Sequence, residues 1–80
     1  MKLPRDISGL SLANALKALG YEITRQSGSH IRLTTAVNGE HHITIPAHDP
    51  LKIGTLAGIL ADIARHHELS RDELLRNLDL

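Results

Sequence analysis

The sequence predicts an α+β domain in which a three-stranded antiparallel sheet carries its helices on one face. Apolar residues recur at three- and four-residue spacing near both ends of the chain, which is typical of amphipathic helices. Three short segments between them alternate apolar and polar residues, as half-buried strands do. Glycine-containing turns separate these segments. The predicted order of elements is therefore α-β-β-β-α, followed by a short extra C-terminal helix.

Length and composition limit the classes of protein to consider. Eighty residues correspond to one domain, so we expect residues 1–80 to fold as a single unit. The chain has no cysteine, which excludes disulfides and thiolate metal ligands. No apolar run approaches the roughly 20 residues of a membrane span, and the N-terminus lacks the apolar core of a secretory signal. We therefore expect a cytoplasmic protein without membrane contact.

The aromatic content and the charge pattern bear on nucleic-acid binding. Tyr21 is the only aromatic residue, which argues against a protein that stacks bases on aromatic side chains. The formal net charge is zero, but residues 1–36 carry five basic and two acidic side chains, and residues 37–80 carry four basic and seven acidic ones. A local basic excess attracts polyanions, although chance also produces an imbalance of this size.

The first helix is expected to end at Gly20, a residue suited to the left-handed position after a helix. Its apolar stripe consists of Leu12, Ala15, Leu16 and Leu19. Ser11 is the favoured N-cap, and Ser8 is the alternative. Strands are then expected over residues 21–26, 30–35 and 42–46. Inward-facing residues of these strands are Tyr21, Ile23, Ile31, Leu33, Ile43 and Ile45.

Both hairpins can be assigned a register, because directly opposed residues share a face. A three-residue loop over residues 37–39 pairs Leu33 with Ile43, and Gly39 supplies the left-handed residue that this loop needs. A three-residue turn over residues 27–29 likewise places Arg32 beside Thr24. The same turn places His30 beside Gln26. The outward face is then a polar patch of Thr24, Gln26, His30, Arg32, His42 and Thr44.

Two further helices follow a loop over residues 46–53. Thr55 is the expected cap of the first of them. Its apolar stripe consists of Leu56, Ile59, Leu60, Ile63 and Ala64. Ser70 and Glu73 match a capping box, which opens the short third helix.

The sequence Ser27-Gly28-Ser29-His30 is the main indication of chemistry. His30 opens a strand and faces away from the core, as does Arg32. Cleavage of RNA through its 2′-hydroxyl needs a proton acceptor, a proton donor and positive charge beside the phosphate. His30 can exchange a proton near neutral pH, and the forked Arg32 guanidinium can hold a phosphate. Both residues also suit an ordinary solvated strand, so their spacing alone does not decide the function.

The start of the second helix offers a second set of candidates. Free backbone N–H groups at Gly54 and Thr55 suit a phosphate, but a simple helix cap explains them equally well. Lys52 is close in sequence. His48 and Lys52 are the candidates for a second proton carrier.

The six histidines do not predict a metal site. They stand at positions 30, 41, 42, 48, 66 and 67. Adjacent residues on a strand point to opposite faces, and adjacent residues on a helix lie about 100° apart, so neither pair chelates one ion well. No recognised metal-binding spacing is present. We expect scattered surface histidines and no metal.

The order of these motifs resembles the HicA toxin family over roughly residues 9–69. The resemblance rests on a short helix, Gly20-Tyr21 with an alternating strand, Gly28-Ser29-His30, Pro46-x-His48, and Gly54-Thr55-Leu56 with Ile59-Leu60. It implies a fold like that of double-stranded-RNA-binding domains. It also implies a ribosome-independent, mRNA-cleaving toxin of a type II toxin–antitoxin system, held inactive by a HicB-like antitoxin. The resemblance makes His30 the catalytic histidine, with no metal or cofactor.

Together, these considerations predict a metal-independent endoribonuclease that is a monomer alone or a hetero-oligomer with its antitoxin. The expected RNA-binding residues are Gly28, Ser29, Arg32, Arg25, Thr24, Lys52 and Thr55. Two alternatives remain: a non-catalytic RNA-binding or antitoxin-binding module of the same fold, and a domain that binds only another protein. Replacement of His30 distinguishes them, because only the nuclease needs its imidazole.

Overall fold

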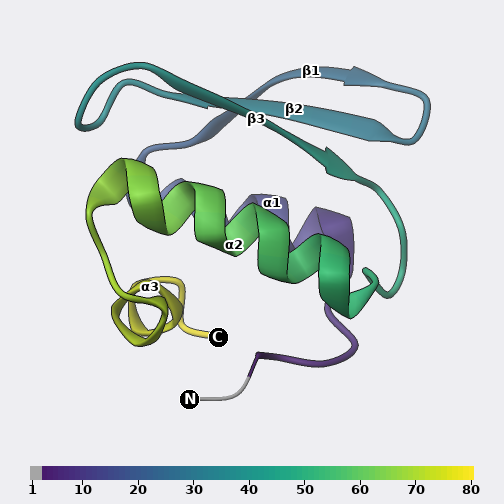
Figure 1. The fold of residues 1–80 in the computed structure, drawn as a ribbon. Helices are drawn as coiled ribbons and strands as arrows, with labels where there is room; N and C mark the ends of the chain where they lie inside the picture. Colours follow the sequence, from purple (N-terminus) through teal and green to yellow (C-terminus); the bar gives the residue numbers. More distant parts are fainter. Residues whose placement is uncertain (1–2) are drawn as a thin grey trace.

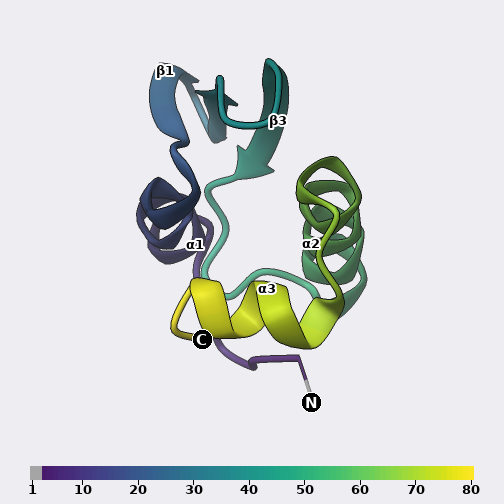
Figure 2. The same ribbon diagram turned by 90° about the vertical axis from the view of Figure 1, so that its left-hand side faces the viewer.

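A computed structural model describes residues 3–80 and confirms the predicted α+β fold. The elements are α1 (Gly9–Ala15), the 3₁₀ helix η1 (Leu16–Leu19), β1 (Glu22–Ser27), β2 (His30–Thr35), β3 (His41–Pro46), α2 (Ile53–His67) and α3 (Arg71–Asn77). The strands form one antiparallel sheet in the order β1-β2-β3. Helices α1 and α2 lie side by side under one face of this sheet (Figure 1). Helix α3 crosses beneath both, away from the sheet (Figure 2).

The first helix begins earlier than the sequence suggested. Ser8, not Ser11, is the N-cap, and its side chain accepts a hydrogen bond from the Ser11 backbone N–H at 3.0 Å. The reason is that the buried face of α1 already starts at Gly9, so the cap must precede it. Gly20 ends the following 3₁₀ turn in the left-handed conformation, with φ 81°, as predicted.

The register of β2 and β3 is confirmed. Leu33 lies opposite Ile43, and Arg32 lies opposite Thr44. Gly39 adopts φ 96° in the connecting loop, which is the left-handed residue that the predicted register required. The last paired residues are Thr35 and His41, so β3 begins one residue before its predicted start.

The register of β1 and β2 is correct at one end of the hairpin and wrong at the other. Ile23 lies opposite Leu33, as predicted, but the turn contains only Gly28 and Ser29, so Ser27 lies opposite His30. A bulge at Thr24 connects the two registers. Without this bulge, a two-residue turn would put Ile23 opposite the outward-facing Thr34. The bulge therefore restores the pairing of inward-facing residues.

This bulge changes the composition of the outward face. Arg25, rather than Thr24, lies opposite Arg32. Gln26 lies opposite the core residue Ile31, so its predicted place beside His30 on the outward face is wrong.

The second helix begins two residues before its predicted cap. Lys52 occupies the N-cap position and makes no side-chain capping bond, and Thr55 lies within the first turn. The predicted stripe is otherwise correct, since Leu56, Leu60 and Ile63 are buried. The capping box of α3 is confirmed, with reciprocal bonds of 3.0 and 3.1 Å between Ser70 and Glu73.

The core lies between the inward face of the sheet and the three helices. The sheet contributes Ile31, Leu33, Ile43 and Ile45, and the helices contribute Leu12, Leu16, Leu56, Leu60, Ile63, Leu74 and Leu75. Helix α3 therefore closes the core from below. Ile23 was expected in this core but is 37% exposed, because the helices pack mainly against β2 and β3.

Candidate functional site

The Gly28-Ser29 turn presents His30 at one end of the sheet. Gly28 has φ 57° at the first turn position, where glycine is favoured because it has no side chain to clash. The Ser29 carbonyl accepts a hydrogen bond from the Ala47 N–H at 2.6 Å, which ties the turn to the end of β3. His30 itself is exposed and lies between Ser27 and Pro46 on the neighbouring strands. Within residues 3–80 its imidazole has no hydrogen-bond or ionic partner. The ring is therefore free to meet a ligand.

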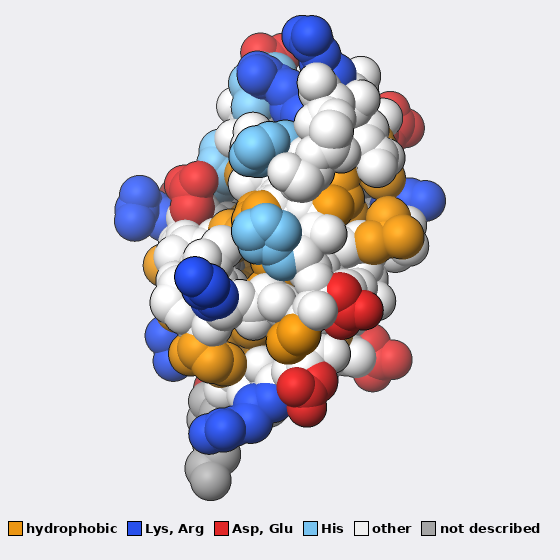
Figure 3. Space-filling view, turned by 90° about the vertical axis from the view of Figure 1, so that its right-hand side faces the viewer, with side chains coloured by type: hydrophobic (Ala, Val, Ile, Leu, Met, Phe, Trp, Pro, Cys, Tyr) orange, Lys and Arg blue, Asp and Glu red, His pale blue; other side chains and the backbone are white. Residues whose placement is uncertain are grey.

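Two arginines lie beside His30 on the outward face. Arg25 and Arg32 are directly opposed on β1 and β2, and both are exposed. Like charges directly opposite each other destabilise a strand pair, so an anion bound between them would offset that repulsion. Figure 3 shows basic and histidine side chains along the upper part of this end of the molecule, where the sheet lies.

The bulge residue Thr24 joins the outward face through its hydroxyl. Its Oγ1 lies 3.3 Å from the Thr34 hydroxyl and donates a longer bond of 3.4 Å to the Arg32 carbonyl. Thr24 therefore contacts β2 at the Arg32 backbone and at the Thr34 side chain. Its direct role is to hold β2 in place. The prediction that Thr24 lies opposite Arg32 is wrong, because Arg25 occupies that position.

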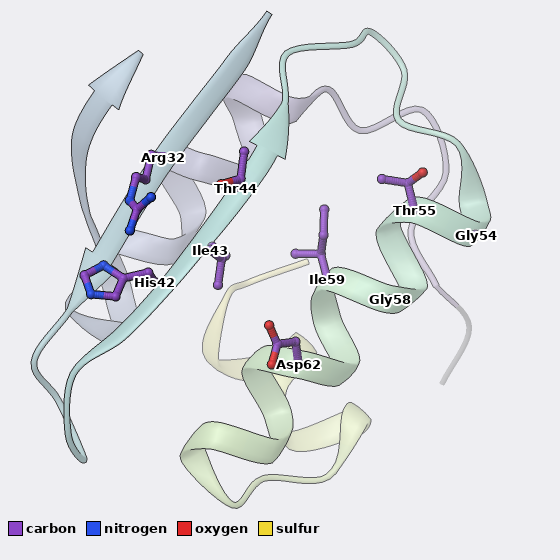
Figure 4. Close-up of a pocket in the computed structure, with 9 residues that line it drawn as sticks. All are labelled: Arg32, His42, Ile43, Thr44, Gly54, Thr55, Gly58, Ile59 and Asp62. Carbon is purple, nitrogen blue, oxygen red and sulfur yellow. The ribbon is translucent and has the colours of Figure 1, made fainter. Parts of the chain in front are cut away.

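A groove of about 590 Å³ runs between β3 and α2 and connects the outward face to the start of α2. It is lined by Arg32, His42, Ile43, Thr44, Gly54, Thr55, Gly58, Ile59 and Asp62 (Figure 4). The structure thus brings Arg32 and Thr55 to one groove although they come from distant parts of the sequence. Within residues 3–80, apart from the adjacent residues and the helix backbone, no heavy atom lies within 4 Å of where a side chain would begin at Gly54 or Gly58, so this helix face is open.

The remaining predicted residues are not among those lining this groove. Lys52 is exposed at the N-cap of α2. His48 lies in the exposed loop after β3, where its carbonyl accepts a hydrogen bond from the Gly9 N–H at 2.9 Å.

Gly58 and Asp62 are groove residues that the sequence analysis missed. The four-residue spacing of Gly54, Gly58 and Asp62 places them on one helix face, which was the available signal.

The residues brought together suit phosphoryl chemistry. An exposed imidazole can accept or donate a proton, and the nearby guanidinium groups can stabilise charge that develops on a phosphate. In the part of the chain that the structure describes, no group of three or more histidine or acidic side chains could hold a metal ion.

A family model described as the HicA toxin of bacterial toxin–antitoxin systems matches residues 11–64. The chain belongs to the HicA toxin family. The match covers the Gly-Ser-His turn, the whole sheet and most of α2. Membership in the HicA family supports the role of a toxin in a toxin–antitoxin system. No curated protein and no solved structure matches the chain significantly.

The HicA family match ends before the last turn of α2, so α3 lies outside it. None of the helices within residues 3–80 is long and apolar enough to cross a membrane.

Proposed function

We propose that this HicA-family chain is a metal-independent endoribonuclease that cleaves mRNA independently of the ribosome. The observation that carries the proposal is the exposed His30 imidazole beside the opposed pair of Arg25 and Arg32 on an open sheet face. His30 removes the proton of the ribose 2′-hydroxyl, whose oxygen then attacks the neighbouring phosphorus. The bond from phosphorus to the 5′-oxygen breaks, and that oxygen receives a proton from water or from the imidazolium. The products carry a 2′,3′-cyclic phosphate and a free 5′-hydroxyl.

The other predicted residues receive binding roles in this proposal. Arg25 and Arg32 hold the phosphate, and Gly28 and Ser29 let the RNA approach the turn closely. Thr55 and Lys52 contact a neighbouring phosphate at the start of α2, where the helix dipole favours negative charge. Thr24 acts through the position of Arg32. His48 is a secondary candidate for the second proton carrier.

The test uses the purified chain with a short single-stranded RNA and with the same RNA carrying one 2′-deoxy nucleotide at the cleaved position. We expect cleavage of the first, no cleavage of the second at that position, and no effect of a metal chelator. Cleavage of the deoxy position, or cleavage that needs a divalent ion, would contradict the mechanism. RNA binding without any cleavage would favour the non-catalytic RNA-binding alternative.

Replacement of Arg32 by alanine is expected to lower kcat/KM for RNA at least tenfold. The loss follows from one charge-assisted hydrogen bond to phosphate, worth about 1.5–3 kcal/mol. The measurement is kcat/KM over a series of salt concentrations. The slope of log(kcat/KM) against the logarithm of the salt concentration should become less steep by about one. Arg71 is the matched control, since it is exposed on α3, beneath the helices and away from the sheet. An equal loss in Arg71→Ala would show that only overall charge matters.

We further propose a HicB-like antitoxin as the protein partner, a cytoplasmic location, and folding of residues 1–80 as a single domain. The toxin is then a monomer alone and part of a hetero-oligomer with its antitoxin. Co-expression with the product of an adjacent HicB-like gene, followed by size measurement with and without that product, tests the partner. A chain that elutes alone in both cases would contradict this assignment.

A further inference from the structure

Three of the histidines gather around Tyr21, at the end of the sheet opposite His30. His41 opens β3, and His66 and His67 close α2. The His41 and His66 rings stack at 4.4 Å with 12° between their planes. His67 meets His66 edge to face at 4.8 Å. The expectation of scattered surface histidines is therefore wrong for these three, because the fold brings two elements together that are distant in sequence.

One hydroxyl links two of these imidazoles. Tyr21 Oη lies 2.7 Å from Nδ1 of His41 and 3.1 Å from Nε2 of His67. A hydroxyl has one hydrogen, so Tyr21 donates to one ring and accepts from the other. When His41 gains a proton at Nδ1, the hydroxyl must turn and donate to His67. A second proton, on Nε2 of His67, would then leave the hydroxyl hydrogen without an acceptor in this chain of bonds.

The third imidazole holds the loop between β2 and β3. Nε2 of His66 lies 3.0 Å from the carbonyl oxygens of both Val37 and Gly39, so this nitrogen must carry a hydrogen. The Asn38 side-chain amide donates in return to the His66 carbonyl at 2.8 Å. Cross-element hydrogen bonds therefore attach the end of α2 to this loop. A charge on His66 would lie directly over the His41 ring.

Charged groups surround the three imidazoles. Asp62 Oδ1 lies 3.4 Å from Nε2 of His41, and the negative end of the α2 dipole lies at the same place. Arg65 lies 3.9 Å from the same carboxylate oxygen and weakens its field at His41. Other charged groups nearby are Glu40 with His42, 3.0 Å apart, and Lys17 and Glu22 around the hollow beside Tyr21. The loop contributes Glu40, which pairs with His42, and the two carbonyl groups that accept from His66. The Asp62 carboxylate thus contacts one of the three imidazoles, that of His41.

The titration of His67 agrees with this geometry. Burial, followed by the neighbouring His66 and His41, lowers the pKa of His67 from its ordinary value of 6.5. The unfolded chain takes up this proton near pH 6.5, whereas the folded chain takes it up only at lower pH. The stability that this group provides is thus complete above about pH 6.5 and is lost as the pH falls below it. Burial, followed by the Asp62 charge, raises the pKa of Tyr21 to about 12, so its hydroxyl keeps its hydrogen throughout this range.

We propose that Tyr21, His41, His66 and His67 form an acid-sensitive clasp that fastens the end of α2 to the β2–β3 loop and opens when more than one imidazole is protonated. The clasp is independent of the proposed nuclease activity, because His30 lies at the other end of the sheet. Opening of the clasp frees the loop and the end of α2 and lowers the stability of the whole domain in mild acid.

The test is urea unfolding of the full chain at pH 7.5, 6.5 and 5.5. We expect the unfolding constant of the wild type to rise as the pH falls, mainly below pH 6.5, by at most tenfold per pH unit for each proton that the folded state excludes. His67→Gln keeps a hydrogen-bond donor toward Tyr21 but cannot gain charge, so this rise should become smaller, by at most a factor of ten per pH unit. The Glu73 carboxyl, whose pKa is lowered from 4.5 mainly by hydrogen bonds to Ser70, titrates below this window.

His48→Gln is the matched control, since His48 lies outside the cluster in an exposed loop. It should leave the wild-type pH dependence unchanged. Equal pH dependence of the wild type and His67→Gln, or an equal change in His48→Gln, would overturn the proposal. A variant that fails to fold does not stop the test, because hydrogen exchange of the wild type gives a second readout. Protection of the amides of residues 37–39 should fall between pH 7.5 and 5.5 more than that of residues 31–33, and equal losses would also overturn the clasp.

Discussion

The His30→Ala chain is expected to lose RNA cleavage by a factor of about 10² to 10⁴ and to cause no growth arrest. This range is typical for the loss of a general acid or base, and no other imidazole lies opposite His30 on the neighbouring strands. The measurement combines cleavage rates of purified protein with growth and transcript decay after induction in cells. Because His30 is exposed and has no partner within residues 3–80, the substitution should leave folding and antitoxin binding intact.

His42→Ala is the matched control for this experiment. His42 is the other histidine on the outward face of the sheet, but both of its ring nitrogens are occupied. Nδ1 lies 2.8 Å from the Thr34 hydroxyl, and Nε2 lies 3.0 Å from the Glu40 carboxylate. We expect this variant to keep most of the cleavage rate. Arrest that persists in His30→Ala would contradict the catalytic role of His30, and a folded wild type without activity would favour a binding module.

The β2–β3 hairpin could be predicted because two independent signals agree there. Inward-facing residues must pair with each other, and Gly39 allows only a particular loop. The β1–β2 hairpin could not be predicted fully, because a bulge has no sequence signal of its own at Thr24. The choice between a three-residue turn and a two-residue turn with a bulge depends on the local backbone, and both place Ile23 opposite Leu33.

The candidate site was predicted in part for a similar reason. His30 and Arg32 belong to one strand, so alternation alone placed both on the outward face. Arg25 reached its place opposite Arg32 only through the bulge. The groove and the histidine cluster each join residues from β3 and α2, and their geometry depends on how the helix packs against the sheet. Spacing within α2 shows which residues share a helix face, but it does not show which strand that face meets.

Close packing at Gly9 leads to the second large expected effect, a loss of stability of about 1–3 kcal/mol in Gly9→Ala. Gly9 is buried at the start of α1, and its N–H donates to the His48 carbonyl. A methyl group there would begin within 2.9 Å of the Pro46 carbonyl carbon and 3.1 Å of the Ala47 Cα. These are backbone atoms that cannot rotate away, so α1 must shift from the end of β3. The measurement is thermal unfolding, in which each kcal/mol corresponds to about 4–8 °C in a domain of this size.

Gly58→Ala is the matched control, and its effect should have the opposite sign. Gly58 lies inside α2, where no heavy atom of residues 3–80 outside the helix backbone and the adjacent residues stands within 4 Å of the added methyl group. Alanine is favoured over glycine in a helix interior by about 1 kcal/mol, so the melting temperature should rise. Gly9 is the first residue of α1, so alanine brings less of this interior gain there, and the contact with the end of β3 should decide the sign of the effect. Two alanine variants that both raise the melting temperature would show that α1 can move away from β3 without loss. A fall in Gly9→Ala alone would establish that the close approach of α1 to this strand end holds the helix in place, beside the turn that carries His30.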